Sequence, residues 1–160
     1  MIDRQNFPVE EPTETDWAYL AGLIDGEGSL ALVHRKGGDR TRPDNVYPYR
    51  SDNSYQCYVT ISNTDLKMID WVRYTFNGCV YFSREREGNR KRQYTVSWQA
   101  SDMVKWILSN CLPYMLTKYD VAESILHFLE VPQWEKELRK FRFKEFKEMK
   151  EQTKITVGGA

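Results

Sequence analysis

The stretch from Leu20 to Gly28, which reads LAGLIDGEG, constrains the fold more than any other part of the chain. A glycine inside a helix costs about 1 kcal/mol relative to alanine, so Gly22 and Gly26 need a structural reason. Ala18, Gly22 and Gly26 are spaced four residues apart and therefore share one face of a helix. This stripe of small residues predicts close packing against another backbone, with Glu27 at the end of the helix.

The remaining elements follow from hydrophobic periodicity and turn residues. Thr13 and Asp16 form a capping-box pattern, which starts a first helix that runs to about Ile24. We predict strands at 29–35, 55–61, 79–83 and 93–99, and helices at 65–76, 102–110, 118–130 and 134–151. The order αββαββα predicts an α+β fold, in which a four-stranded antiparallel sheet carries helices on one face. We expect an N-terminal arm at 1–13, a single domain at 14–151 and a flexible tail at 152–160.

The charge is unevenly distributed, although the net charge of the 160 residues is zero. Residues 1–28 carry seven acidic side chains against one arginine, whereas residues 29–100 carry twelve basic side chains against seven acidic ones. Zero net charge alone speaks against a nucleic-acid partner, but a basic middle segment favours a polyanionic one.

Cysteine usage and hydropathy bear on the setting of the protein. Cys57, Cys79 and Cys111 have no metal-binding spacing, and their odd number argues against a disulfide framework. No apolar run approaches the ~20 residues of a membrane span, and the acidic N-terminus lacks the pattern of a signal peptide. We therefore predict a reduced, intracellular setting without membrane contact.

The face of the sheet that carries no helices is predicted to present polar, aromatic and arginine side chains. Such groups contact base edges and phosphates, and strands can place them in the major groove of double-stranded DNA. An ordinary solvated face is the alternative. The candidate DNA-binding residues on this face and on its two hairpin tips are Val33, Arg35, Arg40, Arg42, Gln56, Tyr58, Thr60, Tyr81, Ser83, Arg84, Arg86, Gln93, Thr95 and Ser97.

With these elements in place, LAGLIDGEG resembles the signature of the LAGLIDADG homing endonucleases, with Gly26 and Glu27 replacing the motif's second Ala and final Asp. The resemblance covers roughly residues 14–130, because a hairpin, an Asn-Thr-Asp helix start and a second hairpin follow. It implies a site-specific endonuclease of intron or intein mobility that cuts both strands of a long, nearly palindromic DNA. One copy of the motif implies a homodimer, with Ala18, Gly22, Asp25 and Gly26 at the interface.

The resemblance also implies the site residues. Glu27 is the catalytic and metal-binding carboxylate, the Gly26 carbonyl is a second ligand, and Lys118 matches a basic residue near the scissile phosphate. Oxygen ligands of this kind suit Mg²⁺, and Mn²⁺ or Ca²⁺ can occupy the same position. Lys67 matches a second basic position, and Ser62 or Asn63 a polar one. For Asp25, bracing of the helix junction is the favoured role.

Two other functions remain open at this stage. A splicing maturase or regulator of the same fold would bind DNA or RNA without cutting it. A protein-interaction domain would account for the charged C-terminal helix, but not for a glycine stripe that ends in an acid.

Overall fold

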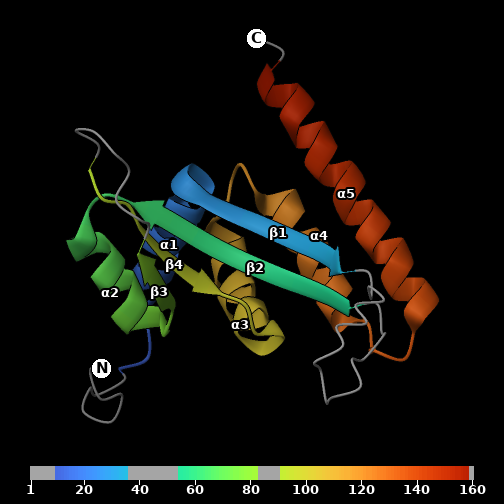
Figure 1. Ribbon diagram of the computed structural model, residues 1–160, viewed down its shortest axis with the longest axis horizontal. Helices are drawn as coiled ribbons and strands as arrows, with labels where there is room; N and C mark the ends of the chain where they lie inside the picture. Colours follow the sequence, from blue (N-terminus) through green and yellow to red (C-terminus); the bar gives the residue numbers. More distant parts are fainter. Residues whose placement is uncertain (1–9, 36–53, 83–90, 159–160) are drawn as a thin grey trace, which may run out of the picture.

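The computed structural model describes residues 10–35, 54–82 and 91–158. Its elements, in chain order, are α1 (Glu14–Glu27), β1 (Gly28–Arg35), β2 (Ser54–Asn63), α2 (Leu66–Phe76), β3 (Cys79–Phe82), β4 (Tyr94–Trp98), α3 (Ser101–Cys111), the 3-10 turn η1 (Leu112–Tyr114), α4 (Tyr119–Glu130) and α5 (Lys136–Gly158). Figure 1 shows them in this order along the colour bar. The predicted α+β fold class is confirmed.

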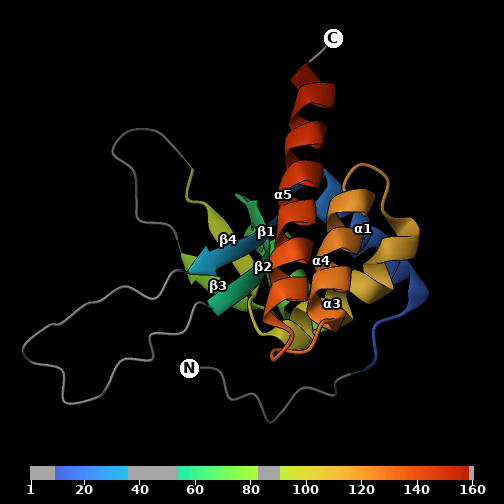
Figure 2. The same cartoon turned by 90° about the vertical axis from the view of Figure 1, so that its right-hand side faces the viewer.

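The described strands form one antiparallel sheet in the order β1-β2-β4-β3. Gly28 of β1 lies opposite Ile61, and Arg35 lies opposite Ser54, so β1 and β2 make one long hairpin. Helices α1, α3 and α4 cover one face of this sheet, whereas no described helix covers the other (Figure 2). The sheet therefore has a packed face and an open face.

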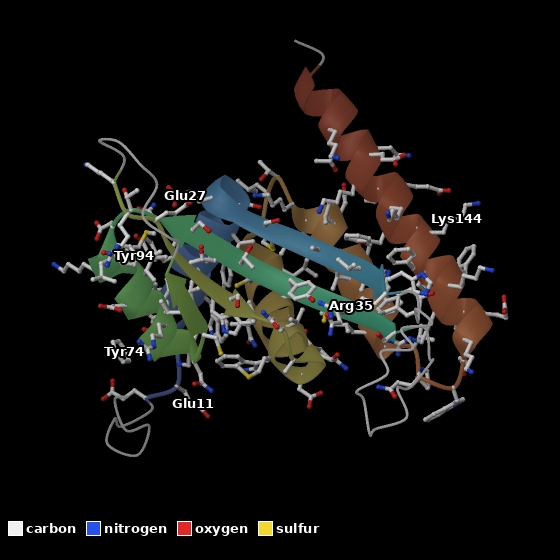
Figure 3. The ribbon with its side chains drawn as sticks, viewed as in Figure 1. Glu11, Glu27, Arg35, Tyr74, Tyr94 and Lys144 are labelled. Carbon is white, nitrogen blue, oxygen red and sulfur yellow. The ribbon has the colours of Figure 1, made fainter. Side chains whose placement is uncertain are left out.

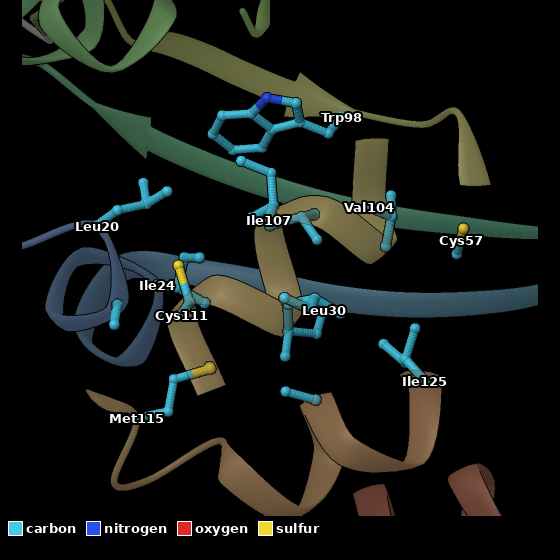
Figure 4. Close-up of a cluster of buried hydrophobic side chains, with 14 of the residues drawn as sticks. Leu20, Ile24, Leu30, Cys57, Trp98, Val104, Ile107, Cys111, Met115 and Ile125 are labelled. Atoms are coloured by element: carbon cyan, nitrogen blue, oxygen red, sulfur yellow. The ribbon is translucent and has the colours of Figure 1, made fainter. Parts of the chain in front are cut away.

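Alternation along the strands explains the packed face. Leu30 and Leu32 of β1 are each 3% exposed, and Val59 and Ile61 of β2 are fully buried, as a period of two predicts. Figure 4 shows how side chains from α1, from the strands and from α3 meet in this core. The side chain of Trp98 also donates a hydrogen bond of 2.9 Å from Nε1 to the carbonyl oxygen of Phe76, which fixes the end of α2.

The predicted helix starts are confirmed where a side chain caps them. The backbone N of Thr13 donates to the Asp16 carboxylate at 2.8 Å, and the Thr13 hydroxyl accepts from the N of Asp16 at 3.3 Å. Asp65 caps α2 by accepting from the backbone N of Lys67 at 2.9 Å. These caps fix where α1 and α2, the two helices next to the Glu27 end of the β1–β2 hairpin, begin.

Two helices end later than the sequence predicts. Helix α1 continues to Glu27 instead of Ile24, because contacts from residues 116–118 hold its last turn, as described below. Helix α5 continues to Gly158, so residues 152–158 extend the helix instead of forming the predicted loose tail. Its added turns contain Thr153, whose hydroxyl donates to the Met149 carbonyl at 3.0 Å. Within the described part of the chain, no helix has both the length and the apolar character needed to cross a membrane.

Candidate functional site

The last turn of α1 and the start of β1 form a tight junction. The backbone N–H of Gly28 donates to the carbonyls of Leu23 and Ile24 and so ends the helix. A Cβ atom at Gly28 would lie 2.6 Å from Cα of Ile24, which no side chain can tolerate. Gly28 is therefore required because the strand leaves the helix directly against the helix backbone.

Asp25 is held on the inner side of this junction. One carboxylate oxygen accepts from the backbone N of Leu116 at 2.6 Å, and the other accepts from the backbone N of Lys118 at 3.0 Å. Burial acts to raise the pKa of Asp25, but the hydrogen bonds from Leu116, Lys118 and Thr117 outweigh it and lower the pKa below its ordinary value. The geometry agrees with the bracing role predicted for Asp25, since its contacts lie within the chain.

Lys118 closes the same junction from the other side. Its ammonium donates to three backbone carbonyls, those of Ile24 at 2.7 Å, Asp25 at 2.8 Å and Gly28 at 2.8 Å. An ammonium group has three donors, so all of them are used. Burial lowers the pKa of Lys118, and the charge of Asp25 partly offsets that effect. Lys118 thus stabilises the negative, C-terminal end of α1.

Glu27 points away from this cluster. Its side chain is exposed, and one carboxylate oxygen accepts from Nδ2 of Asn63 at 2.5 Å. Asn63 ends β2, and its Oδ1 also accepts from the backbone N of Asp65 at 2.8 Å. Asn63 therefore joins the end of β2, the start of α2 and the carboxylate of Glu27. Sequence reasoning named Ser62 or Asn63 for a polar position, and this contact singles out Asn63.

The chemistry around Glu27 fits a hard divalent cation. Carboxylate and backbone carbonyl oxygens are the ligands that Mg²⁺ prefers. The carbonyl of Gly26, the predicted second ligand, is not among the three that Lys118 engages. Among the described residues, no group of three or more His, Cys, Asp and Glu side chains could enclose a metal. A single chain thus offers one carboxylate and adjacent carbonyls, which is a partial coordination shell.

The outer face of α1 carries the predicted small-residue stripe. Gly22 and Gly26 are exposed, and Ala18 is half-buried. A Cβ atom placed on Gly22 or Gly26 would meet no atom of this chain within 4 Å. Contacts within the chain therefore do not explain why glycine, and not a larger residue, occupies these two positions. Leu116, beside the same end of α1, is 87% exposed and extends this apolar surface.

The open face of the sheet gathers several predicted DNA-binding side chains. Arg35 donates from Nη2 to the hydroxyl of Tyr58 at 3.0 Å, and that hydroxyl donates to Oε1 of Gln56. Val33, opposite Gln56 in the register, is 42% exposed. The three polar side chains thus form a connected array near the outer end of the hairpin.

The remaining predicted residues on this face differ in their surroundings. Thr60 and Thr95 are half-buried, and Thr95 shares a hydrogen bond of 2.7 Å with Ser62. Ser97 is a correction: it is only 3% exposed, because β4 lies between two other strands and Thr60 and Cys79 flank it. Gln93 is exposed just before β4, and Tyr81 lies opposite Thr95 in the register. The positions of Arg40, Arg42, Ser83, Arg84 and Arg86 lie outside the described residues.

Comparison with solved structures identifies the class of fold that this geometry represents. The chain has the fold of the LAGLIDADG homing endonucleases, which confirms the resemblance seen in the motif. It is similar to homing endonuclease I-CvuI, solved with a DNA target in the presence of Mg (TM-score 0.56, 16% identity, 73% of this chain and 67% of that chain). It is also similar to the archaeal intron-encoded homing endonuclease I-Vdi141I, complexed with DNA (TM-score 0.58, 11% identity, 88% and 83%).

A third similar structure is longer. The meganuclease I-SmaMI, bound to uncleavable DNA, matches with a TM-score of 0.59 and 15% identity over 84% of this chain, but this chain spans only 43% of that protein. No family model and no curated protein sequence matches the chain. The shared property is therefore the fold.

Proposed function

We propose that this protein is a divalent-metal-dependent endonuclease that cuts both strands of a long, nearly palindromic DNA as a homodimer. The observation that carries the proposal is the exposed Glu27 carboxylate at the end of a helix whose outer face is a glycine stripe. Structural neighbours of the same fold were solved with DNA, and two of them with Mg or Ca, which supports the same partner and cation here.

The two glycines of the stripe support the proposed dimer. Because Gly22 and Gly26 have open space in the isolated chain, a second α1 can approach closely along this stripe. Two copies related by a twofold axis would bring two Glu27 carboxylates together, completing a shell that one chain cannot provide. The exposed Leu116 adds apolar area beside this surface. Asp25, placed at the interface by the resemblance, would support it by holding the junction in shape.

The residues around the cation have separate tasks in this proposal. Glu27 and the Gly26 carbonyl would hold Mg²⁺, with Asn63 orienting the Glu27 carboxylate. When bound, the metal would activate a water and stabilise the leaving oxygen in phosphodiester hydrolysis. The open face of the sheet, with Arg35, Tyr58 and Gln56, would contact bases and phosphates of the DNA.

Lys118 is engaged inside the chain, where its ammonium donates to three carbonyls. Its prediction as a catalytic residue stays a prediction, since donation to water or phosphate requires it to release one of three carbonyls. This engagement favours a second candidate function, a DNA- or RNA-binding protein of the same fold without cleavage.

Selection of cleaved sites from a tiled DNA library with Mg²⁺ tests the proposal and separates the two candidates. We expect paired cuts in nearly palindromic sites. On the selected site, Glu27→Gln should keep binding while cleavage falls by about 10³-fold or more, a loss of about 4 kcal/mol in transition-state stabilisation. If the unmodified protein binds a preferred site but never cuts it, the endonuclease function is wrong and the second candidate stands.

Sedimentation with and without DNA tests the dimer. Gly22→Leu places bulk where the second helix should approach, and no atom of the chain obstructs a Cβ there. We expect a dimer for the unmodified protein and a folded monomer for Gly22→Leu. Ser109→Leu, at an exposed position of α3, is the matched control and should stay dimeric. A monomeric mass for the unmodified protein, both free and on DNA, would exclude the arrangement.

The domain boundaries are part of the same proposal. The predicted domain at 14–151 is extended to Gly158, where α5 ends, and the arm at 1–13 precedes it. The intracellular setting stays a prediction from the sequence.

A further inference from the structure

Helix α5 packs beside the edge of the sheet. Strand β1 is an edge strand, and Nζ of Lys150 donates to its Leu30 carbonyl at 2.7 Å. Seven residues earlier on α5, the ring of Phe143 lies 5.9 Å from that of His34, near the other end of β1. Helix α5 therefore lies beside β1, and its C-terminal end extends beyond the sheet (Figures 1 and 2). It covers part of an edge that would otherwise expose unpaired carbonyls.

The charges of α5 are segregated around the helix. The helix carries eight basic side chains against four acidic ones. Five of the basic ones recur with Glu151 at spacings of three or four residues, which places them on one side of the helix. We call these five exposed residues the lysine stripe: Lys136, Lys140, Lys144, Lys147 and Lys154.

The lysine stripe lies on the sheet side of the exposed half of α5. Going around the helix from Phe146, which is 2% exposed, the side chain of Lys150 lies at the β1 edge, and that of Phe143 lies against His34. The stripe comes next, because Lys147 and Lys154 lie one turn to either side of these positions on the same flank of the helix. Two of the acidic side chains and two exposed apolar side chains of α5 lie farther around: Glu137, Glu148, Leu138 and Phe141.

The stripe positions hold five basic side chains and one acidic side chain, that of the exposed Glu151. Lys144, whose side chain is 76% exposed, lies 3.8 Å from Glu148, a spacing typical of weak surface pairs. Burial lowers the pKa of Lys150, and the like charges of Lys154 and Lys147 lower it further. The stripe is therefore a concentrated positive surface that an anionic partner would stabilise.

The middle of the stripe lies away from the candidate active site. Figure 3 shows Glu27 at one end of the β1–β2 hairpin, with Arg35 and Lys144 toward the other. Since β1 begins beside Glu27 and ends at Arg35, a duplex on the open face that passes Glu27 would reach α5 at its outer flank.

We propose that the lysine stripe of α5 binds the phosphates of duplex DNA that flanks the segment covered by the sheet. The inference rests on the proposed DNA-binding function and extends the DNA contact to a second surface. Such contacts carry no base information, so they should add affinity uniformly and steepen the salt dependence of binding.

Binding to two duplexes tests the inference. One duplex is the site recovered from the cleavage selection, trimmed to its minimal length, and the other carries about ten additional base pairs, one helical turn, at each end. For the extended duplex, Lys140→Gln/Lys144→Gln/Lys147→Gln should lower affinity by roughly tenfold or more. It should also reduce the slope of log K against log salt by about 0.9 for each lost contact. Affinity for the trimmed duplex should stay unchanged.

Two controls show whether a loss of affinity comes from the position of the removed charges, from the lower net charge or from misfolding. Lys105→Gln removes an exposed charge from α3 and should change neither affinity. The triple arginine variant keeps the charge and should restore binding to the extended duplex. If the triple glutamine variant binds the extended duplex as tightly as the unmodified protein does, or if it loses the same affinity for both duplexes, the role of the lysine stripe is wrong. The proposed endonuclease function would stand in either case. No binding of the unmodified protein to any DNA would overturn the proposed function as well.

Discussion

The two carboxylates of the LAGLIDGEG stretch lie two residues apart and have opposite surroundings. Asp25 is half-buried and accepts two backbone hydrogen bonds from the segment that precedes α4. Glu27 is exposed, with one hydrogen bond from Asn63. The first group has its bonding capacity used inside the chain, whereas the second keeps oxygens available for a ligand.

This difference shows how one short motif serves structure and chemistry together. Asp25 and Lys118 fix the last turn of α1 against the loop at 116–118. These contacts hold the end of α1 in place, and Glu27 projects from that end into solvent. The buried contacts of Asp25 and Lys118 therefore position the exposed carboxylate of Glu27. Substitutions on the two sides should therefore separate stability from activity.

The largest effect on stability is expected for Asp25→Ala. This change leaves the backbone N–H groups of Leu116 and Lys118 without their acceptor and removes the negative charge beside the Lys118 ammonium. Because hydrogen bonds to a charged group are worth about 1.5–3 kcal/mol each, we expect a loss of about 3 kcal/mol in the free energy of unfolding. Urea denaturation measures it, and a loss below about 0.5 kcal/mol would contradict the bracing role.

Lys118→Met should have the next largest effect. Methionine keeps much of the packing but leaves three carbonyls at the end of α1 without the ammonium. Part of the gain from these bonds is offset by the burial of the charge, so we expect a loss of about 2 kcal/mol.

A double-mutant cycle with Asp25→Ala checks the assignment, since both residues act on one junction and their effects should not add. Additive effects would show that the two groups act separately.

Asp25→Asn should change the pH dependence of stability, and this effect should be smaller than the losses expected for Asp25→Ala and Lys118→Met. The pKa of Asp25 is lowered in the folded protein from an ordinary value of 3.8, so its stabilisation is present above that value and is lost as the pH falls through the folded pKa. Asp25→Asn should therefore lose less stability than the unmodified protein between pH 5 and pH 3. Urea midpoints at the two pH values measure this, and equal losses would exclude a contribution from Asp25.

The smallest effect on stability is expected for Glu27→Gln. The side chain is exposed, and the amide oxygen of glutamine can still accept from Asn63. The free energy of unfolding should change by less than about 0.5 kcal/mol. A loss above about 1 kcal/mol in the urea experiment would show that Glu27 is also part of the structural framework, which would remove the contrast with Asp25.

Local patterns were sufficient for most of the fold. The alternation of Leu30, Leu32, Val59 and Ile61 along their strands predicts the packed face, because every second side chain of a strand points to the same face of the sheet. The capping residues predict where α1 and α2 begin. Helix ends were less predictable, since the last turn of α1 depends on Lys118, more than ninety positions later in the chain.

The sequence by itself determined the fold class, the glycine stripe and the acid that follows it, because these depend on residue identity and short spacings. Only the tertiary structure decided that Glu27 is exposed whereas Asp25 is half-buried. It also decided that Lys118 donates to three carbonyls and that Ser97 is buried between neighbouring strands. It also decided that α5 lies beside β1, with Lys150 at the sheet edge. Each of these facts depends on contacts between distant segments, which no local pattern encodes.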